Sequence, residues 1–396
     1  MLSPVPNRPP RRSTRVAILG NSGQIRNAWA KSADELFMEV GQNTGNLAFW
    51  FAVARHIDCE YQYFNWSFDP EFVKQNFDCV LFVAANQLNP EWDLGDVAIN
   101  LERCDRPLII VGLGAQAGKL GEKVTLKPGT TRLLSLFSER SVAIGMRGEF
   151  SADVARKNGA RNVEIVGCPS NFINASERHL GRGIADALKT MKDPHRLSIN
   201  LDFNEHLAPI VQRCISWMEE WGGFLVTQGP LDAIQCALGA PELLLASELE
   251  RYAEIMLGRS YDEAARKFLS ARLITFFDTE AWLLFLRSCS LAIGTRLHGN
   301  ILALQAGTPA VIIPHDSRTR ELAETIRMPV VEPETVMTAS SLPDLLSQVE
   351  FDGEAYDQRR AELAATYVGI FEASGVPVTR ELKQLATAPA EIAAQP

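Results

Sequence analysis

The sequence has no pair of cysteines at the spacing that zinc sites and redox motifs use, although seven cysteines occur among its 396 residues. An odd number of cysteines scattered through apolar segments does not indicate a disulfide framework, so we expect reduced thiols in a cytoplasmic protein. No cluster of histidine, cysteine and carboxylate residues has metal-ligand spacing either. The sequence therefore predicts no bound metal.

The chain also lacks a long apolar run, because none approaches the roughly 20 residues that a membrane-spanning helix requires. Its first residues, MLSPVPNRPPRR, are rich in proline and arginine and lack the apolar core of a secretory signal. We therefore expect residues 1–13 to form a disordered arm. At most, we expect a peripheral association with the inner face of a membrane.

Positive charge is in deficit, with 39 lysines and arginines against 48 aspartates and glutamates and a net charge of −9. Such a chain is not built to coat nucleic acid, so no nucleic-acid partner is expected. The sequence does contain 46% hydrophobic residues over a length that suits two globular domains.

The first half of the chain alternates short apolar runs with helical patterns, which is typical of a parallel sheet covered on both faces. The expected strands run into turns rich in glycine and small polar residues. The turn at 112–116 lacks the third glycine and the acidic residue of a dinucleotide fingerprint, so no nicotinamide cofactor is expected. Strands are expected at Arg15–Leu19, Asp78–Ala84, Arg106–Gly112, Arg140–Met146 and Val163–Val166.

The same alternation restarts after about residue 175, so we place domains at 14–175 and 176–396. The leucine-rich residues 231–269 are expected to form an inserted helical pair, and 357–373 a final helix that packs back on the first domain. The expected fold is therefore α/β, with two Rossmann-like domains facing across a cleft in a GT-B-like architecture. Strands of the second domain are expected at Arg196–Leu201, Gly223–Thr227, Arg272–Phe277, Ser290–Ile293, Ala310–Ile313 and Met328–Val331.

One stretch carries a candidate site, namely CSLAIGTRLHGNILALQAGTPAVII from Cys289 onward. A strand ends at Gly294, a helix begins just after Arg296 and His298, and ligands of parallel sheets bind at such strand ends. The free N–H groups of the helix start favour anions, and the arginine fork suits a carboxylate or phosphate. The histidine titrates near neutral pH and is a candidate proton donor. Read alone, the same pair would more often be structural, with the arginine bound to a carboxylate.

The segment TRLHGNILALQAGTPAVII resembles the C-terminal signature of the polysaccharide pyruvyl transferases. Two further blocks resemble that family in the same order along the chain. The first is the turn GQNTGN at 41–46, and the second is a strand followed by Arg147 and by Ser151 in a helix. One departure is Cys168, which stands where the family usually has aspartate, so the role of that carboxylate is not carried over.

The resemblance implies transfer of the pyruvyl unit of phosphoenolpyruvate to two sugar hydroxyls, which forms a ketal and needs no cofactor beyond this co-substrate. It implies that the donor is bound by Arg147, Arg296 and the turn residues Gly294 and Gly299. Arg318, where the family usually has lysine, is expected to hold phosphate with altered geometry. We expect His298 to be the general acid. The candidate cleft-lining residues are Gly41, Asn43, Thr44, Gly45, Asn46, Gly114, Ser151 and His315.

The expected partners are phosphoenolpyruvate and a saccharide acceptor, either free or lipid-linked, with polysaccharide-assembly proteins as further candidates. Two other functions stay open at this point. One is a glycosyltransferase of the same architecture that uses a nucleotide-sugar donor, because a fold does not determine a function. The other is a non-catalytic partner in polysaccharide assembly. A scaffold would have no use for Arg147, Arg296 and His298, which favours an enzyme.

Overall fold

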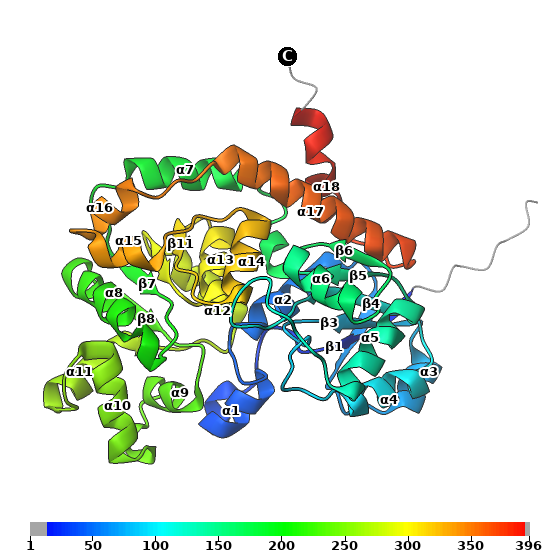
Figure 1. Ribbon diagram of the computed structural model, residues 1–396, viewed down its shortest axis with the longest axis horizontal. Helices are drawn as coiled ribbons and strands as arrows, with labels where there is room; N and C mark the ends of the chain where they lie inside the picture. Colours follow the sequence, from blue (N-terminus) through cyan, green and yellow to red (C-terminus); the bar gives the residue numbers. More distant parts are fainter. Residues whose placement is uncertain (1–13, 393–396) are drawn as a thin grey trace, which may run out of the picture.

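The computed structural model describes residues 14–392, and the expected disordered arm at 1–13 lies outside these residues. Two separate parallel sheets form the frame of the molecule, one from each half of the described chain (Figure 1). The expected fold class, two Rossmann-like α/β domains, is confirmed by these sheets. The predicted boundary near residue 175 falls in the segment between the last strand of the first sheet and the first helix of the second domain.

The first sheet has six parallel strands in the order β2-β1-β3-β4-β5-β6. Its central strands are near-continuous apolar runs because both faces of the sheet are covered by helices. The edge strand β2 was not expected from the sequence, since its residues EYQYF are largely exposed. The strands are β1 (Arg15–Leu19), β2 (Glu60–Phe64), β3 (Cys79–Val83), β4 (Leu108–Leu113), β5 (Ser141–Met146) and β6 (Val163–Ile165), and the helices are α1 (Ala33–Glu39), α2 (Asn46–His56), α3 (Pro70–Asn76), α4 (Gly95–Cys104), α5 (Pro128–Arg140) and α6 (Glu149–Lys157).

The second sheet has five parallel strands in the order β11-β10-β7-β8-β9. The expected last strand at Met328–Val331 is wrong, because Val330 forms only an isolated bridge to Ile312. The strands are β7 (Leu197–Ile199), β8 (Gly223–Val226), β9 (Leu273–Ile274), β10 (Ala292–Gly294) and β11 (Ala310–Ile312), and the helices beside them are α7 (Leu180–Thr190), α8 (Ala208–Trp221), α12 (Thr279–Arg287), α13 (Leu297–Ala306) and α14 (Ser317–Ile326).

The insert between β8 and β9 contains three α-helices rather than the expected pair. They are α9 (Leu231–Ala237), α10 (Ala246–Leu257) and α11 (Glu263–Arg272). Gly258 ends α10 in a left-handed conformation with φ of 64°, a geometry that glycine adopts without strain. A short 3₁₀ turn beginning at Pro241 separates α9 from α10. The apolar pattern through this segment did not show these two breaks.

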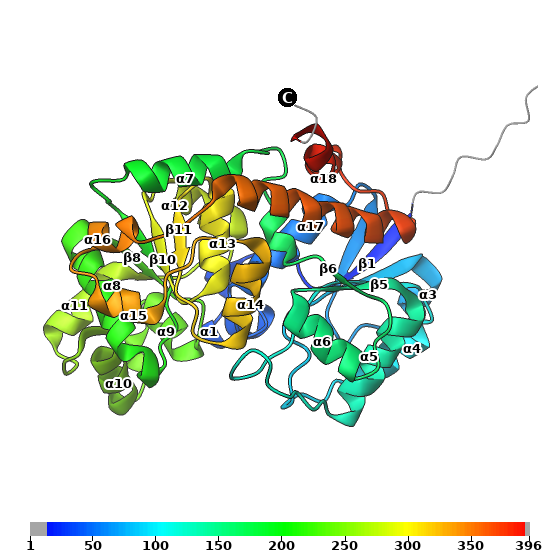
Figure 2. The same cartoon turned by 45° about the horizontal axis from the view of Figure 1, so that its top comes forward.

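The C-terminal region also differs from the expectation. The helix expected at 357–373 is α17 (Gly353–Ala373), but it is not the last, because α18 (Arg380–Ile392) follows and packs against it. Figure 2 shows α17 running beside α7 and on across the first domain, where it contacts β4, β5 and β6. Two short helices, α15 (Pro333–Thr338) and α16 (Leu342–Ser347), precede it.

A buried arginine on α17 holds the segment that connects the two sheets. The Arg360 side chain is fully buried, and its guanidinium donates to the backbone carbonyls of Asn171, Asn174 and Glu177. The three carbonyls satisfy the donors of the buried guanidinium, which would otherwise lose its hydrogen bonds on burial. The relative placement of the domains therefore depends on a charged side chain inside the core.

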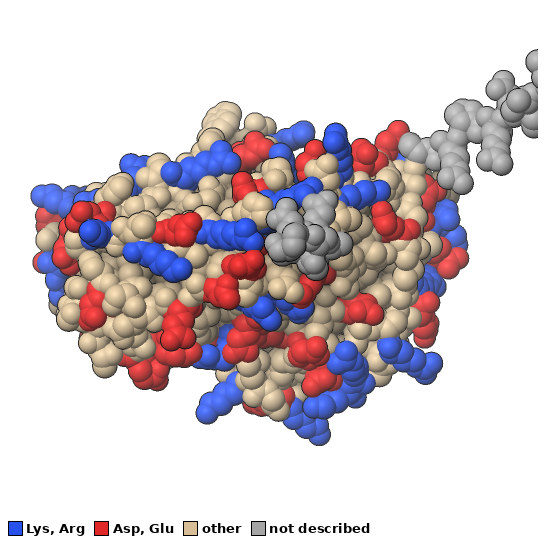
Figure 3. Space-filling model, turned by 90° about the horizontal axis from the view of Figure 1, so that it is seen from above, with Lys and Arg blue, Asp and Glu red and all other residues tan. Residues whose placement is uncertain are grey.

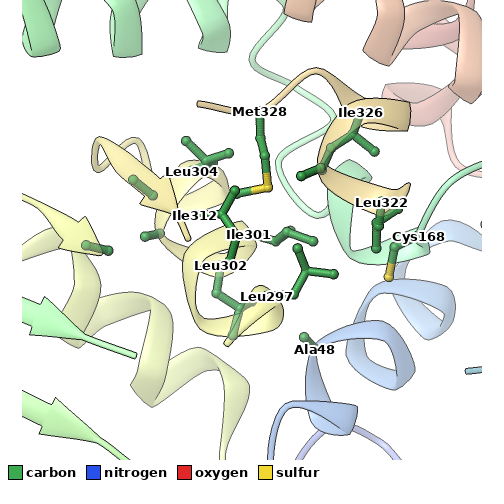
Figure 4. Packing of buried hydrophobic residues seen from close by; sticks show 14 of the residues in the cluster. Ala48, Cys168, Leu297, Ile301, Leu302, Leu304, Ile312, Leu322, Ile326 and Met328 are labelled. Carbon is green, nitrogen blue, oxygen red and sulfur yellow. The ribbon is translucent and has the colours of Figure 1, made fainter. Parts of the chain in front are cut away.

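Helix α13 occupies the centre of the molecule. Its residues from Leu297 to Gln305 are all buried, including the polar His298, Asn300 and Gln305. Figure 4 shows it among side chains of α14 and β11, with Ala48 and Cys168 of the first domain close by. One apolar cluster thus extends from the second sheet into the first domain, and the start of α13 lies between them.

The surface over α7, α17 and α18 carries lysine and arginine interspersed with aspartate and glutamate (Figure 3). This face shows no broad area of one charge, in contrast to a surface that binds nucleic acid through its phosphates. Among the helices of residues 14–392, none is long and apolar enough to cross a bilayer.

Candidate functional site

A pocket lies between the domains, where the carboxyl ends of β7, β8, β10 and β11 face loops of the first sheet. Open parallel sheets bind ligands at this edge. Both domains contribute side chains, and most of these are polar. The lining residues are Asn43, Asn46, Ala85, Asn86, Arg147, Asp202, Gln228, Thr295, Arg296, Leu297, His298, His315, Arg318 and Thr319.

Arg147 enters this pocket from the end of β5, directly before α6. Its side chain is buried, and its Nε donates to the carbonyl of Gly112 at 2.9 Å. A Cβ on Gly114 would lie 2.8 Å from the Arg147 side chain, so glycine makes room for the arginine there. The Nη2 atom is buried without a hydrogen-bond partner. A buried guanidinium group with an unsatisfied donor is suited to an incoming anion.

Arg296 reaches the pocket from the opposite domain, just after β10. Its Nη2 lies 3.2 Å from a carboxylate oxygen of Asp202, while its Nε has no partner. Gly294 has φ of 150° and packs directly on the backbone of Asn200, so a side chain there would collide with β7. The glycine therefore sets the turn that brings Arg296 to the pocket.

His298 stands on the first turn of α13 between the two arginines. Its Nε2 lies 3.7 Å from Cys168 Sγ, and its ring packs 5.4 Å from the ring of Phe49. Burial holds the pKa of His298 well below its usual value, and the positive charges of Arg147, Arg318 and Arg296 lower it further. The free protein therefore holds this imidazole neutral.

Arg318 and His315 come from the segment that follows β11. Arg318 lies on the first turn of α14 and forms an ion pair of 2.7 Å with Asp316. His315 Nε2 is 3.9 Å from Asp202, and its Nδ1 is buried without a partner. Burial lowers the pKa of His315, although the carboxylates of Asp316 and Asp202 oppose that shift.

The glycines and threonine of the first-domain turn shape the pocket without lining it. Gly45 packs against the side chains of His298 and Gln228, and the Thr44 N–H donates to the Gln228 carbonyl. Gly41 has φ of 62°, which explains glycine at that turn. Gly299 similarly packs on Asn200 and Gln228. Of these residues, Gly45 and Thr44 let the two domains approach closely beside the pocket.

Ser151 lies outside the pocket and joins the two domains. Its Oγ donates to Glu321 of α14 at 2.6 Å and accepts from the N–H of Ala115 at 2.8 Å. The same carboxylate accepts from the Ser151 N–H at the start of α6. Burial raises the pKa of Glu321. Ser151 therefore fixes the helix start next to Arg147.

A second hollow of about 400 Å³ lies beside Glu321, between α6, α14 and α17. It is larger than the interdomain pocket. The one deeply buried charged residue on its wall is Glu321, whose carboxylate already accepts a hydrogen bond from Ser151. The other charged residues of this wall are of both signs and more exposed, so it offers no buried positive charge to an anionic ligand. We therefore assign the chemistry to the interdomain pocket.

In addition to Thr319 on the first turn of α14, the sequence did not single out four further polar residues of the pocket. Asp202 follows β7, Gln228 follows β8, and Asn86 follows β3, while Thr295 lies in the turn after β10. All four stand beyond the carboxyl ends of parallel strands, which is the signal that could have found them. No metal cluster of three or more histidine, cysteine or carboxylate residues occurs within the described part of the chain.

The pocket combines three arginines, two histidines and one carboxylate among its described lining residues. Because the arginines come from both domains, the pocket can contact anionic groups at two separate places on a ligand. Buried donors without partners, Arg147 Nη2 and Arg296 Nε, are available to such a ligand. A neutral histidine lies between them and is placed for proton transfer.

Comparison with known proteins gives the family of this chain. The sequence profile of the polysaccharide pyruvyl transferase family matches residues 43–317, more than two thirds of the chain. No curated protein matches in a search by sequence. The chain belongs to the polysaccharide pyruvyl transferase family.

Solved structures align with most of this chain at low sequence identity. S. aureus MnaA bound to UDP is 13% identical with a TM-score of 0.43, covering 91% of this chain and 98% of that one. Anabaena HepE in complex with UDP and glucose is 12% identical with a TM-score of 0.43, covering 96% and 100%. By fold and by family, this protein is therefore a two-domain α/β member of the polysaccharide pyruvyl transferases.

Proposed function

We propose that this protein transfers the pyruvyl unit of phosphoenolpyruvate to a pair of hydroxyls on a saccharide of a bacterial surface polysaccharide or exopolysaccharide. The observation that carries the proposal is the convergence of Arg147 from one domain with Arg296 and Arg318 from the other. Phosphoenolpyruvate has a carboxylate and a phosphate, so it offers separate anionic groups to arginines on opposite walls.

The reaction breaks the bond between carbon 2 of the donor and the phosphate oxygen and forms two carbon–oxygen bonds to the acceptor. Of the two hydroxyl protons, one ends on the methylene carbon, which becomes a methyl group, and the other on the released phosphate. We assign His298 as the group that delivers a proton to the methylene carbon. Arg147 and Arg296 hold the donor and stabilise the phosphate as it leaves.

The neutral state of His298 in the free protein fits this assignment once the donor is considered. Three arginines lower the pKa of His298, together with burial. A bound polyanion offsets their positive charge, so donor binding raises that pKa and favours the protonated imidazole. The acid would then form only when phosphoenolpyruvate is in place.

The acceptor side of the proposal rests on neutral polar groups. Asn43, Asn46, Asn86 and Gln228 line the pocket beside the arginines, and Gln228 Nε2 is buried without a partner. Amides donate to and accept from hydroxyls, so they suit a sugar better than a second anion. We propose a cytoplasmic site of action on a saccharide that is either free or lipid-linked, without a cofactor.

The proposal is tested by the melting temperature of the full chain with millimolar phosphoenolpyruvate, beside a panel of nucleotide sugars. A ligand that binds only the folded protein raises its melting temperature. We expect a rise with phosphoenolpyruvate that disappears in Arg296→Ala and persists in Arg132→Ala, since Arg132 is a surface residue paired with Glu102.

Two results would favour the other functions. A rise with nucleotide sugars alone would indicate a glycosyltransferase and contradict pyruvyl transfer. If no ligand of either class raised the melting temperature and no saccharide gained a pyruvyl ketal in the presence of phosphoenolpyruvate, a non-catalytic role in polysaccharide assembly would replace the enzyme.

A further inference from the structure

The two histidines of the pocket face opposite kinds of charge. His298 is surrounded by Arg147, Arg296 and Arg318, and its nearest side-chain partner is the thiol of Cys168. His315 faces the carboxylates of Asp202 and Asp316 as well as Arg296 and Arg318. Two titratable groups whose surroundings differ in this way are candidates for separate acid and base roles.

Ketal formation needs a base as well as an acid. Each acceptor hydroxyl loses its proton as its oxygen bonds to carbon 2, while His298 supplies a proton to the methylene carbon. A hydroxyl that has not begun to lose its proton is a weak nucleophile, and a positioned base speeds such a step by about 10²–10⁴-fold. The proposed function therefore requires a proton acceptor on the acceptor side of the pocket.

We propose that His315, supported by Asp202, is the general base that removes the proton from an acceptor hydroxyl. This inference rests on the proposed function and extends it to a second catalytic histidine. Asp202 is the only carboxylate among the described residues that line the pocket. Its Oδ2 lies 3.9 Å from His315 Nε2, which places a negative charge where it stabilises the imidazolium that forms.

The free nitrogen of His315 supports a role toward a ligand. His315 lines the pocket, yet its Nδ1 is buried and has no hydrogen-bond partner in the protein. Buried polar atoms are rarely left unpaired unless a ligand or water completes them. A neutral imidazole with a bare ring nitrogen accepts a proton from a hydroxyl that lies against it.

The backbone around the pair holds it in place. The His315 N–H donates to Thr319 Oγ1 at 3.1 Å, and the Asp202 N–H donates to Thr295 Oγ1 at 2.8 Å. Asp202 also contacts Arg296 at 3.2 Å, so one carboxylate touches both the donor-binding arginine and the proposed base. A purely structural Asp202 would serve only to orient Arg296, and the experiment has to separate these roles.

The experiment compares the full-length protein with its His315→Gln and Asp202→Asn variants. Release of phosphate from phosphoenolpyruvate is measured with water, 1,3-propanediol and a set of methyl hexopyranosides as hydroxyl probes. Binding of phosphoenolpyruvate is measured separately by calorimetry. The control is His206→Gln, since His206 is exposed and outside the pocket.

We expect turnover to fall by about 10²–10⁴-fold in both variants, as for loss of a general base. The affinity for phosphoenolpyruvate should stay unchanged or rise in Asp202→Asn, because the substitution keeps an oxygen near Arg296 and removes a negative charge from an anion site. Added imidazole should restore part of the activity of His315→Ala.

The inference is overturned if the His315→Gln variant turns over like the wild type. It is also overturned if both variants lose phosphoenolpyruvate binding in parallel with turnover, because Asp202 and His315 would then only position Arg296. Wild-type protein that binds phosphoenolpyruvate but releases no phosphate with any probe would instead contradict the proposed function, and the base role would fall with it.

Discussion

Two buried histidines of this protein show how a structural site differs from a reactive one. His56 lies at the end of α2, where both ring nitrogens have partners, the hydroxyl of Tyr367 at 3.1 Å and the carbonyl of Phe172 at 3.2 Å. His298 lies in the interdomain pocket with a thiol at 3.7 Å and three arginines nearby. Burial is the main cause of a lowered pKa in both.

Since the pKa is lowered in both His56 and His298, a lowered pKa does not by itself identify a catalytic group. His56 is satisfied by its own fold and packs its ring against Phe172 and Tyr367. Around His298, by contrast, buried donors of Arg147 and Arg296 have no partner within the protein and are open to a ligand or to water. The pocket is therefore distinguished by positively charged side chains from both domains whose N–H donors have no partner in the protein.

The largest effect should come from replacing the pocket histidine. We expect His298→Gln to lower turnover by about 10²–10⁴-fold, because the proposed general acid is lost. Binding of phosphoenolpyruvate and the melting temperature should change little. The measurement is phosphate release beside a calorimetric titration, and turnover at the wild-type rate would end the assignment of His298 as the acid.

The arginines test whether both domains hold the donor. Arg147→Ala and Arg296→Ala should each weaken phosphoenolpyruvate binding by about 2–5 kcal/mol, the usual cost of removing one partner of a buried charge pair. Arg132→Ala is the matched surface control. If only the Arg296 variant lost affinity in the calorimetric titration, the donor would belong to the second domain alone.

His56 should affect stability where His298 does not. We expect His56→Gln to lower the free energy of unfolding by about 1–3 kcal/mol, because the buried Tyr367 hydroxyl and Phe172 carbonyl lose their hydrogen bonds to the imidazole. The pKa of His56 is lowered to about 3, against an ordinary value of 6.5, so the unfolded chain binds a proton that the folded one does not. Stability from this residue is therefore full above about pH 6.5 and is lost as the pH falls toward 3.

This pH dependence can be measured by denaturant unfolding between pH 7 and pH 4.5. The wild type should lose more stability over this range than His56→Gln, by up to about 1.4 kcal/mol for each pH unit below 6.5. The exposed His206→Gln variant should follow the wild type. Parallel curves for the wild type and His56→Gln would show that His56 is not held neutral in the folded protein.

The smallest effect is expected at Cys168, beside His298. In Cys168→Asp a carboxylate near the imidazole should raise the pKa of His298, so the pH optimum of turnover should move upward. The same negative charge should weaken phosphoenolpyruvate binding modestly. Cys168→Ser is the uncharged control, and pH profiles that coincide for the two variants would show that this position does not influence the acid.

The sequence predicted the fold class and the centre of the pocket because both depend on local patterns. Apolar runs of strand length indicated the two sheets, and the glycines around Arg296 and His298 indicated a strand-end turn. Asp202 and Gln228 were not predicted as site residues, because each follows a strand without a glycine-rich motif. The parallel pairing of β7 and β8 brings both residues to the pocket.

Other differences arise from contacts that no local pattern reports. No sequence pattern around His56 indicates its hydrogen-bond partner Tyr367, which lies more than three hundred residues away in α17. The three helices of the insert and the additional helix α18 were not predicted correctly, for a related reason. Their ends depend on single residues such as Gly258, and their packing partners are distant along the chain.

The central claim is that the interdomain pocket binds a donor with two anionic groups. The most direct measurement is a calorimetric titration of the full chain with phosphoenolpyruvate, beside inorganic phosphate, pyruvate and a UDP-sugar. We expect phosphoenolpyruvate to bind more tightly than phosphate or pyruvate, because it would contact the arginines of both domains at once. Binding of the UDP-sugar with no detectable binding of phosphoenolpyruvate would contradict it.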